Sequence, residues 1–421
     1  MEKKEKNPFK RFLKMLGPGV ITGASDDDPS GIGTYSVAGA SLGFATLWTA
    51  VVTFPLMIAV QYTCAKIGMV SGQGLAGVLR QYYSRKWLYP AVVCVVIANT
   101  INAGVDIGAM SEAIGLFAPL PRAMVVVAIA LVIVALQIFG SYRLIQKIFK
   151  WLALTLFAYI GAAFFAHPHW GEVLWATVIP TFKFDNKYLM TLVAILGTTI
   201  SPYLFFWQTS EEVEEEKVLG RNTIAERKGA TKAELKYAEW DTLIGMAFCN
   251  VVFYFVILAS AATLHVAGKT EIQSATEAAQ ALRPLAGSGA TVLFALGLIG
   301  AGFLAVPVLT GSSAYAVSET FGWKSGLDEK PGQAPRFYAI IAISTLIGML
   351  INFVGINPIR ALFWTAVLNG VISPPLLVVI MLVANNKKVM GKRVNGRFAN
   401  IGGWTATIVM FSAAIGMLLT W

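Results

Sequence analysis

The chain has 421 residues, of which 56% are hydrophobic and 13% are charged, and its mean hydropathy is +0.65. This balance excludes a soluble globular domain, in which about 25% of residues are charged, and indicates an all-α polytopic membrane protein. The formal net charge is +10. In a soluble protein that charge would point to nucleic acid, but in a membrane protein basic loops explain it better, so we expect a lipid bilayer and no nucleic acid as the surroundings.

Windows of about 20 apolar residues predict eleven transmembrane helices. In chain order they span approximately 16–39, 44–67, 89–115, 122–141, 147–167, 187–210, 240–267, 288–317, 336–354, 361–384 and 401–421. Cys64, Cys94 and Cys249 are scattered through these spans, which argues against a disulfide framework or a cysteine metal site. We find no motif of an enzyme, no cofactor site and no protein partner.

The distribution of basic residues predicts the orientation of the chain. With residues 1–15 on the cytoplasmic side, most of the 33 Lys and Arg fall in cytoplasmic segments. Those in outer segments are Arg122, Lys183, Lys187, Lys269, Arg283 and Arg360. We therefore expect a multi-pass protein of the plasma membrane with its N-terminus in the cytoplasm and its C-terminus outside.

The first span contains the acidic, helix-breaking sequence Asp26-Asp27-Asp28-Pro29-Ser30-Gly31. A carboxylate at the centre of a membrane helix costs on the order of 3 kcal/mol or more, so this run needs a compensating ligand or water. The adjacent proline and glycine indicate an interrupted helix whose free carbonyls can face a cation. The alternative is that the run lies at the membrane edge and caps a helix that begins at Pro29.

The sixth span contains a second break, Leu196-Gly197-Thr198-Thr199-Ile200-Ser201-Pro202-Tyr203. Pro202 has no amide hydrogen and clashes with the carbonyl of Thr198, which predicts a free oxygen ligand there. Thr198, Thr199 and Ser201 add hydroxyls at the same level. The alternative is a simple proline kink whose hydroxyls bond back to the helix.

Two broken spans five helices apart predict an inverted repeat with the substrate at the breaks. The first repeat would cover 16–167 and the second 187–384, joined by an outer loop at 168–186, with cytoplasmic loops at 211–239 and 385–400 and an appended helix at 401–421. The 211–239 loop begins with five glutamates among six residues and then mixes both signs of charge. We expect either a solvated helix or an electronegative inner vestibule there.

These motifs resemble the Nramp family of divalent-metal transporters. Gly17-Pro18-Gly19 and Asp28-Pro29-Ser30-Gly31 are similar to its Gly-Pro-Gly and Asp-Pro-Gly-Asn, and 198–203 falls at its Ala-x-x-Met-Pro-His. Asp106-Ile107-Gly108-Ala109 resembles its Asp-x-Ala-Glu. The resemblance implies a LeuT-type 5+5 fold with helices 1 and 6 broken, alternating access, and ion ligation by Asp28, the Thr198 carbonyl and the position of Ser201.

The chain departs from the family pattern at four positions: Gly31 for asparagine, Ser201 for methionine, Ala109 for glutamate and Tyr203 for histidine. This set is similar to the Nramp-related magnesium transporters. Loss of a soft thioether removes a bias against hard Mg²⁺, and Gly31 leaves space for the waters that Mg²⁺ retains. Asp28 would be the principal carboxylate, with Asp27 or Asp26 as a second one.

Other intramembrane polar residues are candidates for supporting roles. Asn369 on the tenth span could approach the ion when the site closes, or could simply bond to a neighbouring helix. Asp106 and Glu112 on the third span could line a path or support the site from behind, although Glu112 lies near the end of the span. Thr199 and Tyr203 complete this supporting set.

The sequence therefore predicts alternating-access transport of Mg²⁺, and also Mn²⁺, into the cell. Because Ala109 and Tyr203 cannot relay protons near neutral pH, we expect uncoupled uniport driven by concentration and voltage. The alternative is a proton-coupled Mn²⁺ or Fe²⁺ transporter of the Nramp type. An amino-acid transporter of the same fold is disfavoured, since the acidic run would repel a substrate carboxylate.

Overall fold

The computed structural model describes residues 17–140 and 154–420. This part of the chain is helical and contains no strand. Nine of its helices are long and apolar enough to cross a membrane. The first predicted span is broken into two shorter helices, and the fifth is described only from residue 154 onward, with an apolar stretch at Thr155–Phe165. The described residues are therefore consistent with the predicted eleven spans.

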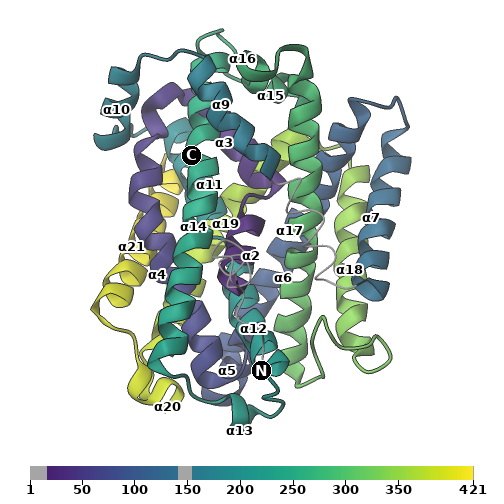
Figure 1. Cartoon of the computed structure of the whole chain (residues 1–421), viewed down its shortest axis with the longest axis vertical. Coiled ribbons are helices and arrows are strands. Elements are labelled where there is room, and N and C mark those ends of the chain that lie inside the picture. The colour runs from purple at the N-terminus through teal and green to yellow at the C-terminus, as the bar shows by residue number, and fades with distance from the viewer. Residues whose placement is uncertain (1–16, 141–153, 421) are drawn as a thin grey trace, which may run out of the picture.

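The helices stand roughly parallel in one bundle (Figure 1). The unbroken spans are α4 (Trp48–Ser71), α6 (Arg85–Gly115), α7 (Arg122–Phe139), α14 (Lys232–Ser260), α17 (Ala290–Phe321), α18 (Pro335–Leu350), α19 (Pro358–Ala384) and α21 (Arg397–Leu419). The two broken spans are α2 (Pro18–Asp26) with α3 (Pro29–Leu42), and α11 (Asn186–Thr199) with α12 (Pro202–Val218). The shorter helices are α5 (Leu75–Tyr82), α9 (Ala158–Phe165), α10 (Trp170–Val178), α13 (Ile224–Arg227), α15 (Ala275–Ala279), α16 (Arg283–Ala286) and α20 (Lys387–Met390).

The short helices mark the two ends of the bundle. In Figure 1, α10, α15 and α16 lie at the upper end, and α5, α13 and α20 lie at the lower end. The lower end carries the segments that the positive-inside rule assigns to the cytoplasm. Each broken span thus has one half toward each end, with α3 and α11 above the breaks and α2 and α12 below them.

The segment predicted as a loop at 211–239 is mostly helical. The sixth span continues in α12 to Val218, and the next span, α14, already begins at Lys232. The expectation of a solvated acidic helix is wrong for Glu211, Glu212 and Glu216, which are buried. Two of them have polar partners: Gln208 Nε2 donates to Glu212 at 2.9 Å, and Arg221 pairs with Glu216.

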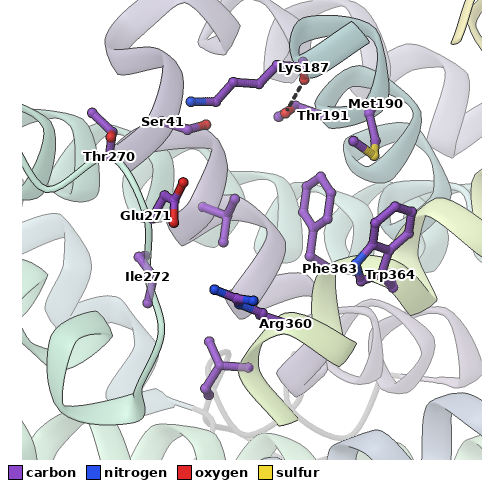
Figure 2. A pocket seen from close by; sticks show the side chains of 12 residues that line it. Ser41, Lys187, Met190, Thr191, Thr270, Glu271, Ile272, Arg360, Phe363 and Trp364 are labelled. Carbon is purple, nitrogen blue, oxygen red and sulfur yellow. Dashed lines mark hydrogen bonds between the residues drawn. The ribbon is translucent and has the colours of Figure 1, made fainter. Parts of the chain in front are cut away.

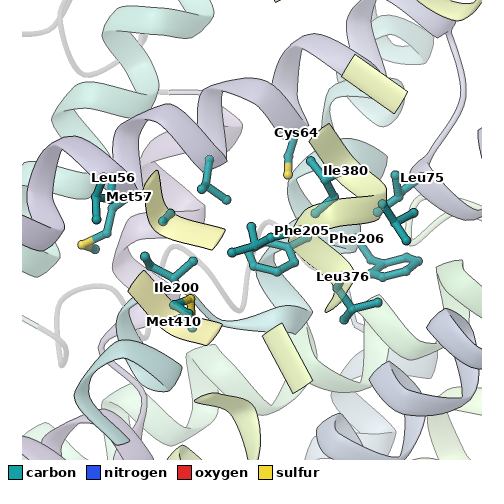
Figure 3. Packing of buried hydrophobic residues seen from close by; sticks show 14 of the residues in the cluster. Leu56, Met57, Cys64, Leu75, Ile200, Phe205, Phe206, Leu376, Ile380 and Met410 are labelled. Atoms are coloured by element: carbon teal, nitrogen blue, oxygen red, sulfur yellow. The ribbon is translucent and has the colours of Figure 1, made fainter. Parts of the chain in front are cut away.

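Close helix packing holds both broken spans in place. A Cβ atom on Gly23 of α2 would overlap the Gly245 backbone of α14, and one on Gly197 of α11 would overlap the α19 backbone at Gly370. Small residues at such crossings let helix backbones approach closely in a membrane. Below the second break, Phe205 and Phe206 of α12 pack into apolar side chains of α4, α5 and α19 (Figure 3). The breaks are therefore fixed within a packed core.

Candidate functional site

The first break lies in the interior of the bundle. α2 ends at Asp26, Asp27 follows as its C-terminal cap, and Asp28 caps the N-terminus of α3 with extended backbone angles (φ −70°, ψ 167°). The Asp28 carboxylate accepts hydrogen bonds from the Gly31 amide at 2.6 Å and from Ser30 Oγ at 3.0 Å. The capping role considered from the sequence is therefore present, but Asp28 is only 1% exposed rather than at an open edge.

The second break separates α11 from α12 at Ile200 and Ser201. Ser201 takes the N-cap position with extended angles (φ −80°, ψ 138°), and Pro202 begins α12. The Ser201 hydroxyl donates to the carbonyls of Gly197 at 3.0 Å and Thr198 at 2.8 Å. The prediction that Pro202 leaves the Thr198 carbonyl free is thus wrong, because a hydroxyl replaces the missing amide donor. Thr199 Oγ1 also bonds back, to the Ile195 carbonyl at 2.9 Å.

Oxygen atoms from both breaks converge on Gly31. A Cβ atom built at this glycine would lie 3.1 Å from Thr198 Oγ1, 3.2 Å from Asp28 Oδ1 and 3.4 Å from the Asp26 carbonyl oxygen. A carboxylate, a hydroxyl and a carbonyl therefore surround a position that has no side chain. This is the point at which α2, α3 and α11 meet, and a larger residue at position 31 would have to displace the oxygens.

Asn102 on α6 completes this cluster, and sequence reasoning missed it. Its Nδ2 atom donates to Asp28 Oδ2 at 2.8 Å, and its Oδ1 atom is buried without a hydrogen-bond partner. A signal was available in the sequence: Asn102 precedes Asp106 by four residues, which places both on the same face of a helix. Since Gly31 has no side-chain amide, Asn102 brings an amide oxygen to the cluster from a different helix.

The other carboxylates are arranged around Asp28 without joining it in one cage. Both oxygens of Asp106 are buried within electrostatic range of Asp28, and the backbone amide of Ser30 lies toward this carboxylate. Asp26 Oδ2 accepts from Cys249 Sγ at 3.4 Å, and neither oxygen of Asp27 has a hydrogen-bond partner. Within residues 17–140 and 154–420, no three His, Cys, Asp or Glu side chains are grouped so as to hold a metal ion. A cation site here would combine Asp28 with neutral oxygens.

The remaining predicted residues lie at different distances from the breaks. The Tyr203 hydroxyl donates to the Ser25 carbonyl at 2.9 Å and so ties α12 to α2. Asn369 is buried on α19, in the turn that packs against Gly197 of α11. Glu112 is far more exposed and pairs with Arg122 at 3.6 Å near the end of α6, which separates it from the buried cluster.

A cavity of about 430 Å³ opens at the upper end between α3, α11, α19 and the segment 270–272 (Figure 2). Lys187, Glu271 and Arg360 are among the side chains that line it. Of the three helices that border the cavity, α3 and α11 are the upper halves of the broken spans. The cavity therefore lies between the helices that carry Gly31 and Thr198, although neither residue lines it.

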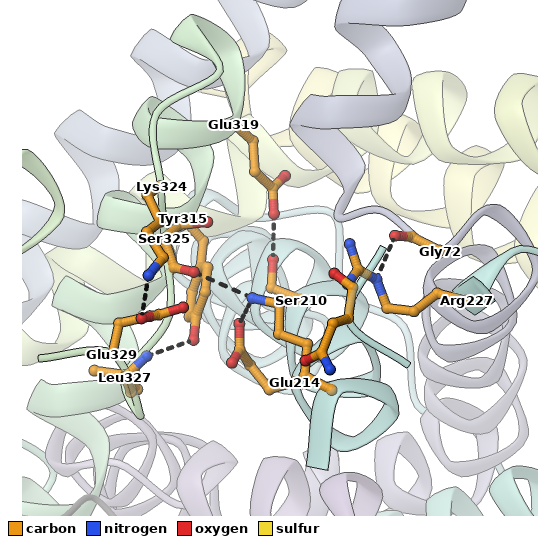
Figure 4. A network of polar contacts seen from close by, with 12 residues as sticks. Gly72, Ser210, Glu214, Arg227, Tyr315, Glu319, Lys324, Ser325, Leu327 and Glu329 are labelled. Carbon is orange, nitrogen blue, oxygen red and sulfur yellow. Dashed lines mark hydrogen bonds and ion pairs between the residues drawn. The ribbon is translucent and has the colours of Figure 1, made fainter. Parts of the chain in front are cut away.

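Polar contacts tie the elements together at the lower end (Figure 4). Glu319 of α17 accepts from Ser210 Oγ of α12 at 3.0 Å and from the Gly77 amide of α5 at 3.1 Å. The Asp241 carboxylate of α14 accepts hydrogen bonds from the amides of Gly17 and Gly19 at 2.8 and 2.6 Å. These amides at the start of α2 have no acceptor within the helix, and Asp241 provides one. The lower halves of both broken spans are thus anchored to neighbouring helices.

Comparisons with known proteins agree with this geometry. Residues 19–420 match the Nramp family, described as Natural resistance-associated macrophage protein-like. The chain is 28% identical over 411 residues to a divalent metal cation transporter, MntH, of Klebsiella pneumoniae (strain 342), covering 95% of this chain and 92% of the relative.

Solved structures show the same fold. The manganese transporter of Eremococcus coleocola superposes with a TM-score of 0.77 at 18% identity, over 100% of this chain and 88% of that one. Mhp1, a nucleobase-cation-symport-1 family transporter, gives 0.60 at 12% identity (97% and 93% covered), and MhsT gives 0.63 at 12% (96% and 97%). The predicted all-α LeuT-type fold is confirmed, and by the match over 19–420 the chain belongs to the Nramp family.

Proposed function

We propose that this protein transports divalent metal cations across the membrane by alternating access, with the ion bound where the two broken spans meet. The observation that carries the proposal is the convergence of Asp28 Oδ1, Thr198 Oγ1 and the Asp26 carbonyl on Gly31. Broken helices present such oxygens at the midplane of transporters with inverted repeats. The family match and the relatives named as divalent metal or manganese transporters support it; none of these relatives is named as an enzyme.

The ligand set that we propose consists of oxygen atoms. A carboxylate has about four acceptor positions, and donors from Gly31, Ser30 and Asn102 already occupy most of those of Asp28. Asp28 would therefore bind the ion through a single oxygen. Thr198 Oγ1 and Asn102 Oδ1 would add neutral ligands, and retained waters would complete the shell.

The residues predicted as ligands keep roles in this proposal. Asp27 would act through water, since its unbonded oxygens lie beside the site without joining it. Gly31 provides space, and Ser201 stands where a thioether would otherwise favour softer ions. Asn369 would approach the ion when the site closes.

The proposed ions are hard divalent cations, Mn²⁺ and Mg²⁺. Oxygen ligands suit both ions, and Mg²⁺ in particular tolerates few protein ligands and several waters. The relatives described above are named for manganese or for divalent metal cations, and they give no support to a magnesium-specific branch. Mn²⁺ is therefore the first ion to test, and the absence of a thioether or thiolate in the cluster is the reason to include Mg²⁺.

Energy coupling separates two candidate mechanisms. Ala109 and Tyr203 support uncoupled uniport, because alanine has no titratable group and a tyrosine hydroxyl keeps its proton near neutral pH. The Tyr203 hydroxyl donates this proton in a hydrogen bond to the Ser25 carbonyl. A divalent ion crossing 100 mV gains about 4.6 kcal/mol, twice the value for one charge, which is enough for useful uptake. Proton-coupled Mn²⁺ or Fe²⁺ transport is the alternative, and the names of the relatives, a divalent metal cation transporter and a manganese transporter, fit its ions. The buried Asp106 carboxylate, within electrostatic range of Asp28, is its best candidate proton carrier.

Uptake into proteoliposomes with an internal pH dye tests these proposals together. We expect uptake of Mn²⁺ and Mg²⁺ that Asp28→Ala abolishes, while Glu172→Ala, which removes an exposed carboxylate on α10, leaves uptake unchanged. Normal uptake by the Asp28→Ala variant would refute the site. Metal influx accompanied by acidification that Asp106→Asn removes would replace uniport by the proton-coupled mechanism.

A further inference from the structure

A second cavity, of about 400 Å³, lies at the lower end of the bundle between α4, α14 and the first turn of α21. Four cationic side chains and one carboxylate are among its lining residues: Lys66, Lys392, Arg393, Arg397 and Glu239. Within the described ranges, no ion pair involves any of them. Among the described residues, four positive charges therefore face one carboxylate in this cavity, and none of the five groups is engaged in an ion pair.

The N-terminus of α21 adds backbone donors to the same cavity. This 23-residue helix begins at Arg397 after Gly396, which has no side chain to cap it. The first amides of a helix lack acceptors within the helix and lie at the positive end of its dipole, which makes them a ready site for an anion. Phe398 and Ala399, whose amides belong to this first turn, also line the cavity.

Contacts with α4 hold the cavity in shape. Lys66 is 6% exposed, and its Nζ atom donates to the Val394 carbonyl at 2.9 Å. Asn395 Nδ2 donates to Thr63 Oγ1 at 3.1 Å. An ammonium group has three donors, so Lys66 keeps two for a ligand. The loop that carries Lys392 and Arg393 is thereby fixed against the membrane-spanning part of the bundle.

The surroundings of the cavity indicate where the anion comes from. Phe398 and Ile401 on α21 and Trp240 on α14 are 59%, 67% and 56% exposed. Exposed apolar and indole side chains beside basic residues are typical of the membrane–water interface. Basic pockets between spans on the cytoplasmic side bind the head groups of anionic lipids. A free phosphate ion would use the same donors but would make no use of this apolar border.

We propose that this cavity binds the phosphate ester of an anionic phospholipid, with its acyl chains lying along α21. Arg393 and Arg397 would contact the phosphate oxygens, Lys66 would approach from the interior, and the α21 amides would complete the site. Guanidinium and phosphate match in geometry and charge, which makes these the strongest contacts expected. The bound lipid would join α4, α14 and α21 at a point remote from the proposed ion site.

The test is the thermal stability of the full-length protein in detergent as phosphatidylglycerol is added. We expect phosphatidylglycerol to raise Tm, and phosphatidylcholine and inorganic phosphate at the same concentration not to do so. In Arg393→Gln/Arg397→Gln, the phosphatidylglycerol concentration for half of the effect should rise at least tenfold. The matched control is Lys387→Gln/Lys388→Gln, which removes the same charge from exposed positions in the same loop, outside the cavity.

Each other outcome overturns a defined part of the proposal. Equal loss in both double variants would show a general charge effect and no site. An equal response to inorganic phosphate would assign the cavity to a free anion instead of a lipid. If the arginine double variant does not purify, native mass spectrometry of the single variant Arg397→Gln provides the same decision, because Arg397 is a proposed phosphate contact with an exposed side chain. We expect fewer retained phosphatidylglycerol molecules than in wild type, and an unchanged number would refute the site.

Discussion

Replacement of Asn102 by leucine tests the part of the site that the sequence did not reveal. Leucine has nearly the same size but removes the donor that lies 2.8 Å from Asp28 Oδ2 and the unbonded Oδ1 atom. A hydrogen bond to a charged group contributes about 1.5–3 kcal/mol, which corresponds to roughly 10- to 150-fold in affinity at 1.36 kcal/mol per factor of ten. Removal of a group that hydrogen-bonds to a metal ligand, as Asn102 Nδ2 does to Asp28, typically lowers metal affinity by about 10- to 100-fold.

The assay is Mn²⁺ binding by calorimetry together with the KM of uptake in proteoliposomes. We expect Asn102→Leu to raise both Kd and KM by about 10- to 100-fold. The matched control is Asn99→Leu, one turn earlier on α6, where Nδ2 donates to the Leu309 carbonyl at 3.1 Å. That change should cost about 1 kcal/mol of stability and leave Mn²⁺ affinity unchanged. An unchanged Kd in Asn102→Leu, or an equal loss in Asn99→Leu, would refute the reasoning.

Three further changes probe the breaks and the lower end. Gly31→Ala places a Cβ atom 3.1 Å from Thr198 Oγ1 and 3.2 Å from Asp28 Oδ1. We therefore expect lower affinity for Mn²⁺ and Mg²⁺ with Tm nearly unchanged. An affinity equal to that of the wild type would show that position 31 does not face the ion. Ser201→Met introduces a soft thioether and should shift competition uptake toward Cd²⁺ over Mg²⁺; an unchanged ion profile would count against its placement. Glu319→Gln weakens the hydrogen bonds that Ser210 Oγ and the Gly77 amide donate to this side chain. We expect faster thiol labelling of cysteines introduced on the lower half of α12. Unchanged labelling would argue against an anchoring role for Glu319.

The positions of the two breaks could be predicted because their causes are local. Pro29 and Pro202 cannot continue a helix, and in both cases the residue before the proline takes extended angles and begins a new helix. The spans were predictable for the same reason, since a run of about 20 apolar residues is a property of one segment.

The partners of the site could not be predicted because they come from distant segments. Asn102 donates a hydrogen bond to Asp28, which lies 74 residues away in the sequence. Asp241 accepts one from the Gly19 amide, which lies 222 residues away. The free Thr198 carbonyl was expected from Pro202 alone, without the Ser201 hydroxyl that bonds to it. The sequence at the acidic end of α12 predicts either a solvated helix or an electronegative vestibule, because the burial of Glu211, Glu212 and Glu216 depends on how α12 packs against other spans.

The most direct test of the central claim is the position of Mn²⁺ in a structure determined with the ion bound, located by its anomalous scattering. The account predicts a single peak bonded to an Asp28 oxygen and adjacent to Thr198 Oγ1 and Gly31. It also predicts that this peak disappears in Asp28→Ala. A peak on the side of Asp26 and Cys249, or a peak that persists in Asp28→Ala, would contradict it.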